Sequence, residues 1–350
     1  EVEHQHKNWK VQLKGAGETP YSRTADGLAV LRSSVREYLC AEAMFHLGVP
    51  TTRSLSLSLS GDNVLRDVLY DGNPAYEKGA IVSRISPSFL RFGNYEIFSA
   101  RKNVKYLKVL VDYTIKHHFP HLGKPSKENY INFFREVSER TLKMIIDWQR
   151  VGFVHGVMNT DNMSILGLTI DFGPYGWLEG FDFGWTPNTT DRQNKRYRYG
   201  NQPNIGLWNL YQLANALYPI IEDVEPLEAV LNQYKVDFEA QSFTMMKSKL
   251  GLFSVDENDL HLIQALEDNL QLVETDMTIF FRLLSDFSDV KTGFHLIENA
   301  FYDLENITDE VKMRWINWFE IYQNRIVKET ISTEERKTKM DLVNPKYVLR

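Results

Sequence analysis

Two short polar segments constrain the fold and chemistry of this 350-residue chain more than any other part of its sequence. The first is His155–Asn162, with the sequence HGVMNTDN, and the second is Asp171–Pro174, with the sequence DFGP. Between them, Met163–Ile170 is short, apolar and ends in β-branched residues, which is typical of a β-hairpin that brings two turns together. Mg²⁺ prefers oxygen ligands and usually takes one or two protein carboxylates while phosphates and waters complete its shell. The amide of Asn162 and the carboxylate of Asp171 therefore predict a site for Mg²⁺ on nucleotide phosphates.

The spacing within these segments agrees in part with that of protein kinases. A kinase places one metal-binding Asn seven residues after a His and a second metal ligand in an Asp-Phe-Gly turn, and here Asn162 follows His155 by seven residues. The match ends at Val157, where a kinase has the Asp that accepts the proton of the substrate hydroxyl. Asp161 instead stands directly before Asn162. A lone Asp-Phe-Gly is better explained as an ordinary polar turn, but both segments together favour the nucleotide–Mg²⁺ site.

Composition excludes several classes of protein. With 43% hydrophobic and 13% aromatic residues over 350 positions, the chain is globular and long enough for two lobes or domains. A net charge of −6 argues against nucleic-acid binding, which needs a basic face. No apolar run approaches the length of a membrane span, and the single cysteine, Cys40, has no partner for an internal disulfide. We therefore expect a soluble protein with no nucleic-acid or membrane partner. We also expect a monomer, although composition does not indicate the oligomeric state.

The first fifty residues predict a strand followed by a helix. Trp9–Lys14 alternates as a strand does, and glycines end it. Ser33 or Ser34 is expected to cap a helix that ends at Gly48 and buries Cys40 as a small hydrophobe. The residues expected to face the core from this helix are Val35, Leu39, Ala43 and Leu47.

Lys14 and Glu37 stand where a kinase-like fold places an ion pair. Lys14 closes the predicted strand, and Glu37 lies in the first turns of the predicted helix. Kinase-like folds pair such a lysine with such a glutamate to hold the ammonium against nucleotide phosphates. The sequence therefore predicts a Lys14–Glu37 ion pair, with two solvent-exposed side chains as the alternative.

Two turn signals follow in this part of the chain. Tyr21–Gly27 predicts a polar loop whose Asp26-Gly27 step exposes backbone amides. Leu55–Ser60 alternates strictly between apolar and polar residues, then meets Gly61-Asp62-Asn63 and resumes as Val64–Tyr70. This pattern predicts a hairpin in an antiparallel sheet.

Two arginines flank the next turn. Arg84 lies in a predicted strand, Ala80–Ile85, and Arg91 follows the turn that begins at Ser86. Guanidinium groups suit bidentate binding of phosphate, so both arginines are candidates for a nucleotide site. Ordinary surface charge is the alternative.

Helical periodicity dominates the chain from about Asn94 onward, which places a lobe boundary near residue 100. We expect an N-lobe over residues 1–100 and a C-lobe over residues 101–350. The segments expected to be helical are Val104–His118, Tyr130–Val151, Leu207–Leu217, Leu260–Leu272 and Val311–Ile326.

Three runs of this sequence resemble the selenoprotein O family. They are Gln12–Gly17 (QLKGAG), Leu31–Glu37 (LRSSVRE) and the stretch from His155 to Pro174, and recognisable sequence extends from Trp9 to at least Leu210. The resemblance implies an α+β, protein-kinase-like bilobal fold with a smaller β-rich N-lobe and a larger helical C-lobe. It also implies an adenylyltransferase that moves AMP from ATP to Ser, Thr or Tyr hydroxyls of proteins and releases pyrophosphate.

The resemblance further implies roles for individual residues, with ATP inverted relative to ordinary kinases. Lys14, Arg84 and Arg91 would surround the buried γ-phosphate, and Glu37 would orient Lys14. The remaining implied roles are nucleotide contact for Asp26 and Gly27, binding of Mg²⁺ (or Mn²⁺) for Asn162 and Asp171, and proton acceptance for Asp161. The expected compartment is the cytoplasm for a bacterial protein and the mitochondrion for a eukaryotic one.

The sequence departs from the family pattern at both ends. The family's glycine-rich nucleotide segment before the lysine strand, and its redox-active cysteine or selenocysteine after residue 350, are not found. The 350 residues are therefore expected to be part of a longer chain. Two alternatives in function stay open beside AMP transfer: a kinase-like phosphotransferase, which Val157 disfavours, and an ATP-binding pseudoenzyme, which the retained Lys14, Asp161, Asn162 and Asp171 disfavour.

Overall fold

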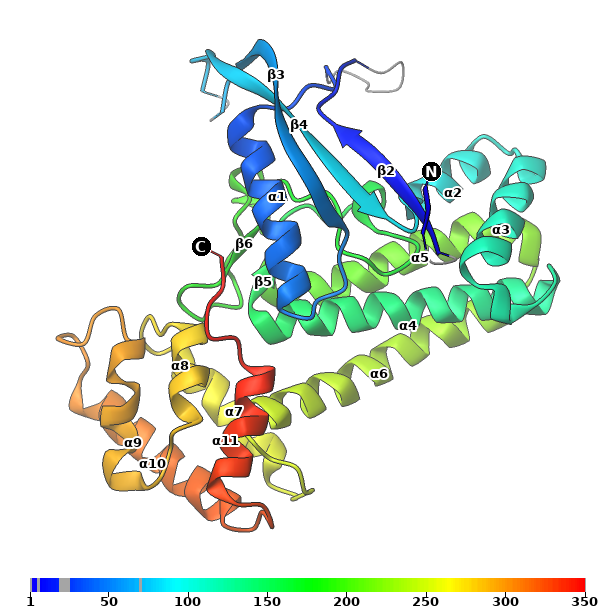
Figure 1. Ribbon diagram of the computed structural model, residues 1–350. Helices are drawn as coiled ribbons and strands as arrows, with labels where there is room; N and C mark the ends of the chain where they lie inside the picture. Colours follow the sequence, from blue (N-terminus) through cyan, green and yellow to red (C-terminus); the bar gives the residue numbers. More distant parts are fainter. Residues whose placement is uncertain (1, 5–6, 19–25, 69–70, 350) are drawn as a thin grey trace. The chain divides into compact units, whose positions relative to one another are not determined.

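A computed structural model describes residues 2–4, 7–18, 26–68 and 71–349 (Figure 1). The chain divides into two compact units, here called unit 1 and unit 2. Unit 1 consists of Glu1–Met144, Val157–Gly173 and Gly206–Leu231, and unit 2 of Ile145–Gly156, Pro174–Ile205 and Asn232–Arg350. The helices α4 (Lys127–Val151), α5 (Gln202–Ile221) and α6 (Glu225–Lys249) contribute residues to both units. Long helices and an antiparallel sheet together give the predicted α+β class, whereas the lobe boundary at residue 100 stays a prediction.

An antiparallel sheet of four strands, in the order β1-β2-β4-β3, forms one part of unit 1. Its strands are β1 (Val2–His4), β2 (Lys7–Lys14), β3 (Arg53–Arg66) and β4 (Ala75–Ser86). Gln12 on β2 stands opposite Arg84 on β4, and Lys14 stands opposite Val82. Because side chains alternate along a strand, Gln12, Lys14 and Arg84 share one face of the sheet.

The hairpin predicted around Gly61 is wrong, because β3 continues through this glycine as one long strand. Its pairing with β4 shifts between Leu59, which faces Ala80, and Asn63, which faces Lys78. Two extra residues on β3 are thus absorbed as a bulge. Gly61 has a φ of 92°, a left-handed conformation that glycine adopts without strain. The Gly-Asp-Asn signal therefore marks an irregularity inside a strand.

Helix α1 (Leu31–His46) packs on β3 and β4 (Figure 1). It begins after Val30 and not at Ser33 or Ser34, and the Ser33 hydroxyl donates to the carbonyl of Val30 at 3.0 Å. The predicted core face is also wrong, because Leu39 is 47% exposed. The residues that α1 buries are Ser34, Glu37, Cys40, Ala41 and Met44, so the prediction of a buried Cys40 is confirmed.

The rest of unit 1 includes α2, α3 and, within Val157–Gly173, most of the two polar segments. α2 (Phe92–Ala100) leads into α3 (Val104–His118), which has the predicted bounds. The predicted hairpin at Met163–Ile170 is wrong, because its two arms pair with different neighbours. The amide of Ile165 donates to Leu90 O at 3.0 Å, and that of Thr169 donates to Pro50 O at 2.8 Å. The segment is therefore a loop held between the sheet and α2.

Unit 2 is mainly helical and has an aromatic core. Its elements are β5 (Phe153–Val154), β6 (Gly176–Trp177), α7 (Asp259–Leu270), α8 (Met277–Leu284), α9 (Val290–Ile297), α10 (Asp309–Ile326) and α11 (Thr333–Val343). Trp315, Trp318, Phe319 and Tyr322 lie on one face of α10 at helical spacing, and all four are fully buried. The helices predicted near residues 260–272 and 311–326 are confirmed.

None of the helices in the described ranges combines the length and the apolar character that crossing a bilayer requires.

Candidate functional site

Five charged side chains form one connected network in unit 1. Lys14 Nζ donates to Glu37 Oε2, and Arg84 Nη1 donates to Glu37 Oε1 at 2.9 Å. Arg84 Nη1 also contacts Asp171 Oδ1 at 2.7 Å, and Arg91 Nη2 contacts Asp171 Oδ2 at 2.7 Å. The five residues come from two strands, from α1, from the residue before α2 and from the loop after residue 157, so they are far apart in the sequence. The predicted Lys14–Glu37 ion pair is present, and we call this cluster the charged network.

The network is anchored in the interior at one end and reaches solvent at the other. Glu37 and Arg84 are 2% and 4% exposed. The side chain of Lys14 is 35% exposed and that of Arg91 is 23% exposed. A buried ion pair is stable only while both partners are present, because either charge alone would be strongly destabilised. Glu37 and Arg84 therefore form the fixed base of the network, and Lys14 and Arg91 form its accessible side. Asp171, whose side chain is 15% exposed, lies between the two.

Asp171 is the carboxylate around which the positive charges gather. Burial alone would raise its pKa, but the charges of Arg84, Arg91 and Lys14 outweigh burial and hold the pKa below its ordinary value. The backbone of Asp171 has a φ of 59°, in the left-handed region that few residues other than glycine adopt. The deprotonated carboxylate is the form that binds a metal ion.

Arg91 connects the network to the segment that contains Asp161. Arg91 immediately precedes α2, and its backbone amide donates to Asn94 Oδ1 at 2.9 Å. Its Nη1 donates to the carbonyl of Asp161 at 2.9 Å while Nη2 contacts Asp171. One guanidinium group therefore holds both polar segments that the sequence singled out.

The donor atoms near Asn162 and Asp171 suit a hard cation that also binds phosphate. Asn162 Nδ2 donates to the carbonyl of Val157 at 2.9 Å, so this hydrogen bond uses the amide nitrogen and not the amide oxygen. Within the described part of the chain, no three His, Cys, Asp or Glu side chains are close enough to form a complete metal site. One carboxylate and one amide oxygen are what Mg²⁺ typically takes from a protein when phosphates and waters supply its other ligands. The chemistry of these two side chains therefore suits the predicted metal, and the metal site itself stays a prediction.

Asp26 and Gly27 lie beside a different partner. Asp26 forms a bidentate ion pair with Arg66 of β3, at 2.7 and 2.8 Å, and this pairing lowers the pKa of the carboxyl. Gly27 has a φ of 69°, and a β-carbon there would stand 2.3 Å from the carbonyl oxygen of Gly17. The other residues of the predicted polar loop, 21–25, lie outside the described residues. The ion-pair partner of Asp26 is thus Arg66 and not a member of the charged network.

Three residues that contact predicted site residues were not identified from the sequence. Gln12 Oε1 accepts a hydrogen bond from Arg84 Nη2, Arg66 binds Asp26, and Gly93 faces the carboxylate of Asp161. Gln12 could have been found, because it precedes Lys14 by two residues and so shares its face of the strand. Arg66 and Gly93 carry no local signal, since their partners are distant in the chain.

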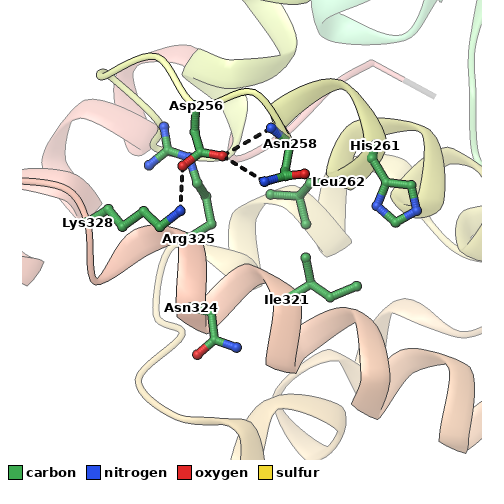
Figure 2. Close-up of a pocket in the computed structure, with 8 residues that line it drawn as sticks. All are labelled: Asp256, Asn258, His261, Leu262, Ile321, Asn324, Arg325 and Lys328. Carbon is green, nitrogen blue, oxygen red and sulfur yellow. Dashed lines mark hydrogen bonds and ion pairs between the residues drawn. The ribbon is translucent and has the colours of Figure 1, made fainter.

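Unit 2 contains a cavity of about 340 Å³ that is a weaker candidate. Figure 2 shows Asp256 accepting hydrogen bonds from Asn258 and pairing with Lys328. Arg325 pairs with Asp259 at 2.5 Å and with Glu329 at 2.7 Å. The lining residues are Asp256, Asn258, His261, Leu262, Ile321, Asn324, Arg325 and Lys328. The charged groups of this cavity thus neutralise one another, which is typical of a structural ion-pair network.

Comparison with known proteins identifies the family of this chain. The family model described as "Protein adenylyltransferase SelO" matches residues 1–350. A protein nucleotidyltransferase YdiU from Flavobacterium johnsoniae is 60% identical over 353 residues, which cover all of this chain and 68% of that relative. Proteins with the same name from Rhodopirellula baltica and Azoarcus sp. are each 51% identical over 98% of this chain, and cover 67% and 66% of those relatives. The chain therefore belongs to the family of the protein adenylyltransferase SelO.

Proposed function

We propose that this protein transfers AMP from ATP to Ser, Thr or Tyr hydroxyls of other proteins, with release of pyrophosphate, on a kinase-like bilobal fold. Family membership and the relatives' name, protein nucleotidyltransferase, support the reaction class. The observation that carries the proposal is the charged network, in which three cations meet two carboxylates beside Asp161. The network has one more positive than negative charge. Together with a divalent metal ion, this positive charge would balance much of the negative charge of a triphosphate.

Lys14, Arg84 and Arg91 would bind the terminal phosphates of ATP, in a pose inverted relative to that of ordinary kinases. The shared contacts of these cations with Glu37 and Asp171 support this assignment, because they place all three charges in one cluster. Guanidinium groups are suited to bidentate phosphate binding. Charge that develops on the leaving pyrophosphate would then be stabilised without reorganisation of the site.

Asn162 and Asp171 would hold Mg²⁺, with Mn²⁺ as an alternative ion. The metal would supply Lewis-acid neutralisation of charge on the phosphates. The lowered pKa of Asp171 keeps this carboxylate in its metal-binding form. Glu37 would orient Lys14, and Asp26 and Gly27 would contact the nucleotide from the turn held by Arg66.

The chemical step uses Asp161 as proton acceptor. The oxygen of the protein hydroxyl attacks the α-phosphorus, and the bond from this phosphorus to the bridging oxygen of the β-phosphate breaks. The electron pair of that bond leaves with pyrophosphate, while the hydroxyl proton passes to the Asp161 carboxylate. Val157 stands where a kinase has its own proton acceptor, so a hydroxyl placed as in a kinase meets no base.

Mass spectrometry tests the proposal directly. Incubation with MgATP is expected to add the mass of AMP to acceptor proteins, and fragmentation should locate it on Ser, Thr or Tyr. Asp161→Asn should abolish the adduct while leaving ATP binding intact. Adducts with the mass of phosphate would support a phosphotransferase instead, and tight ATP binding with no adduct would support a pseudoenzyme. The acceptor proteins, the monomeric state and the compartment stay predictions.

A further inference from the structure

Helix α3 exposes a stripe of large apolar side chains on its outer face. Tyr106, Val109 and Tyr113 are 54%, 57% and 39% exposed. Their spacing of three and four residues places them on one face of the helix, opposite the buried Leu107 and Val111. We call these three residues the α3 stripe. Single exposed apolar residues are common, but an ordered stripe at the spacing of helix–helix contacts is typical of an interaction surface.

The α3 stripe is bordered by positive charge. Arg101 and Lys102 precede α3. Lys105 lies four residues before Val109 and Lys116 seven residues after it, and these spacings place both lysines on the same side of α3 as the stripe. None of these four exposed cations forms an ion pair with any residue that the structure describes. The one carboxylate of α3, Asp112, is neutralised by Lys108 at 2.8 Å and accepts a hydrogen bond from Tyr130. A basic patch on a chain with a net charge of −6 favours an acidic partner.

α2 links this surface to the candidate site within unit 1. The first residues of α2 adjoin Arg91 and Asp161, and its last residues lead to Arg101. α2 packs on α3 (Figure 1), and the rings of Phe98 and Tyr106 lie 6.2 Å apart. The nine residues of α2 span about 14 Å. A protein bound to the stripe would therefore place its own neighbouring segments within reach of Asp161.

We propose that the α3 stripe docks an acidic amphipathic helix of the protein that receives AMP. The apolar face of that helix would lie on Tyr106, Val109 and Tyr113, and its Asp and Glu residues would face Lys105 and Lys116. This inference rests on the proposed function, because the docked helix belongs to the acceptor. Docking at the α3 stripe would let the enzyme select a protein without recognising the residues that flank the acceptor hydroxyl.

Two designed peptides test the surface without any need for catalysis. Both are fluorescein-labelled amphipathic helices with leucine on one face, one with Glu and the other with Lys on the polar face, and each ends in a flexible Ser-containing tail. The full 350-residue protein should bind the acidic peptide, less tightly as salt rises, and bind the basic one at least about tenfold more weakly. Tyr106→Ser with Val109→Ser should weaken binding of the acidic peptide about tenfold, the loss typical of an interface aromatic residue.

Matched variants separate docking from general surface effects. Tyr211 and Val236 are 53% and 59% exposed, so Tyr211→Ser with Val236→Ser changes the same residue types at equal exposure elsewhere. That pair should leave binding unchanged. Lys105→Glu with Lys116→Glu should reverse the preference between the two peptides, whereas Lys235→Glu alone should not. Because all these positions are exposed, the variants are expected to unfold at the same denaturant concentration as the unchanged protein.

The Ser tail makes failure of docking and failure of the proposed function distinguishable. With α-labelled ATP, the stripe variants should raise KM for the acidic peptide about tenfold and leave kcat unchanged. AMP transfer with equal KM for both peptides would overturn the docking surface and leave the proposed function standing. Selective binding of the acidic peptide with no AMP transfer to its Ser tail would leave the docking surface standing and would count against the proposed function. A dimer of the unchanged protein that dissociates in the stripe variants would assign the surface to a second copy of the chain and overturn the proposal.

Discussion

The carboxylate of Asp161 lies so close to Gly93, in the first turn of α2, that a β-carbon on Gly93 would stand 2.3 Å from Asp161 Oδ1. Gly93 does not have a positive φ, so it is the space and not the backbone conformation that requires glycine here. The first turn of a helix carries partial positive charge and favours a carboxylate nearby. The missing side chain of Gly93 thus lets α2 hold both Asp161 and, through Arg91, Asp171.

The first prediction follows from this close approach. Gly93→Ala should displace the Asp161 carboxylate and lower kcat for AMP transfer about a hundredfold, because ångström-scale misplacement of a catalytic group costs about that much. ATP affinity should change little, since Gly93 does not belong to the charged network. Radiolabel transfer and calorimetry with MgATP measure the two quantities.

A double substitution and a control sharpen this test. Gly93→Ala combined with Asp161→Asn should be no slower than Asp161→Asn alone, because both changes remove the same interaction. Ser99→Ala, near the other end of α2, should leave kcat unchanged. Additive effects in the double variant would contradict a positioning role for Gly93.

The second prediction concerns the metal. Asp171→Ala should abolish the increase in ATP affinity that Mg²⁺ produces, because it removes the carboxylate ligand. Affinity for metal-free ATP should stay equal or rise, since Arg84 and Arg91 lose a competing partner. Calorimetry in excess Mg²⁺ and in a chelator distinguishes the two effects, with Asp223→Ala as a control on an exposed ion pair. A full response of the Asp171→Ala protein to Mg²⁺ would remove the assignment.

The third prediction separates the two arginines by their burial. Arg84→Ala leaves Glu37 buried with one partner fewer, and should lower the free energy of unfolding by roughly 3 kcal/mol. Arg91→Ala removes a partly exposed ion pair and should cost less than about 1 kcal/mol. Both should depress AMP transfer. Urea denaturation measures the difference, and equal stability losses for the two variants would refute the assignment of Arg84 to the fixed base.

The fourth prediction is a dependence of stability on pH. Burial, with a smaller effect of Asp268, raises the pKa of Glu267 on α7 from 4.5 to about 7. Between these values the unfolded chain has already released the proton that the folded protein retains, so this group lowers stability as pH rises through that window. Glu267→Gln should therefore stabilise the protein at pH about 8 and change little at pH about 4. Urea midpoints at both values, with Glu257→Gln as an exposed control, test this; an equal effect at both pH values would count against it.

Sequence alone predicted the charged network best where a motif and a local pattern coincided. Lys14 was identified by its place at the end of an alternating strand, and Glu37 by its place in the following helix. The burial of Arg84 was not predicted, because no local signal distinguishes a buried arginine from a surface one. Its environment is set by Glu37 and Asp171, which are 47 and 87 residues away in the chain.

The errors have one physical cause, which is that long-range pairing overrides local pattern. In α1 the hydrophobic pattern predicted that Leu39 would be buried. The structure instead buries the face of α1 that carries Glu37, where Glu37 pairs with Arg84 of the sheet. In β3 the Gly61 signal fits a hairpin and a bulge equally well, and only the register with β4 decides between them. Met163–Ile170 likewise pairs with Leu90 and Pro50, which no local pattern indicates.

The central claim is that the protein transfers AMP, and not the terminal phosphate, from ATP. The position of the label that is transferred from ATP tests this claim most directly. Protein acceptors are incubated with the enzyme and Mg²⁺, using ATP labelled at the α position in one reaction and at the γ position in another. The inverted pose predicts that only the α label becomes attached to a protein hydroxyl. Val157→Asp should not change this outcome, because the pose and not a single base decides which phosphorus is attacked. Attachment of the γ label by the unchanged protein would contradict the account.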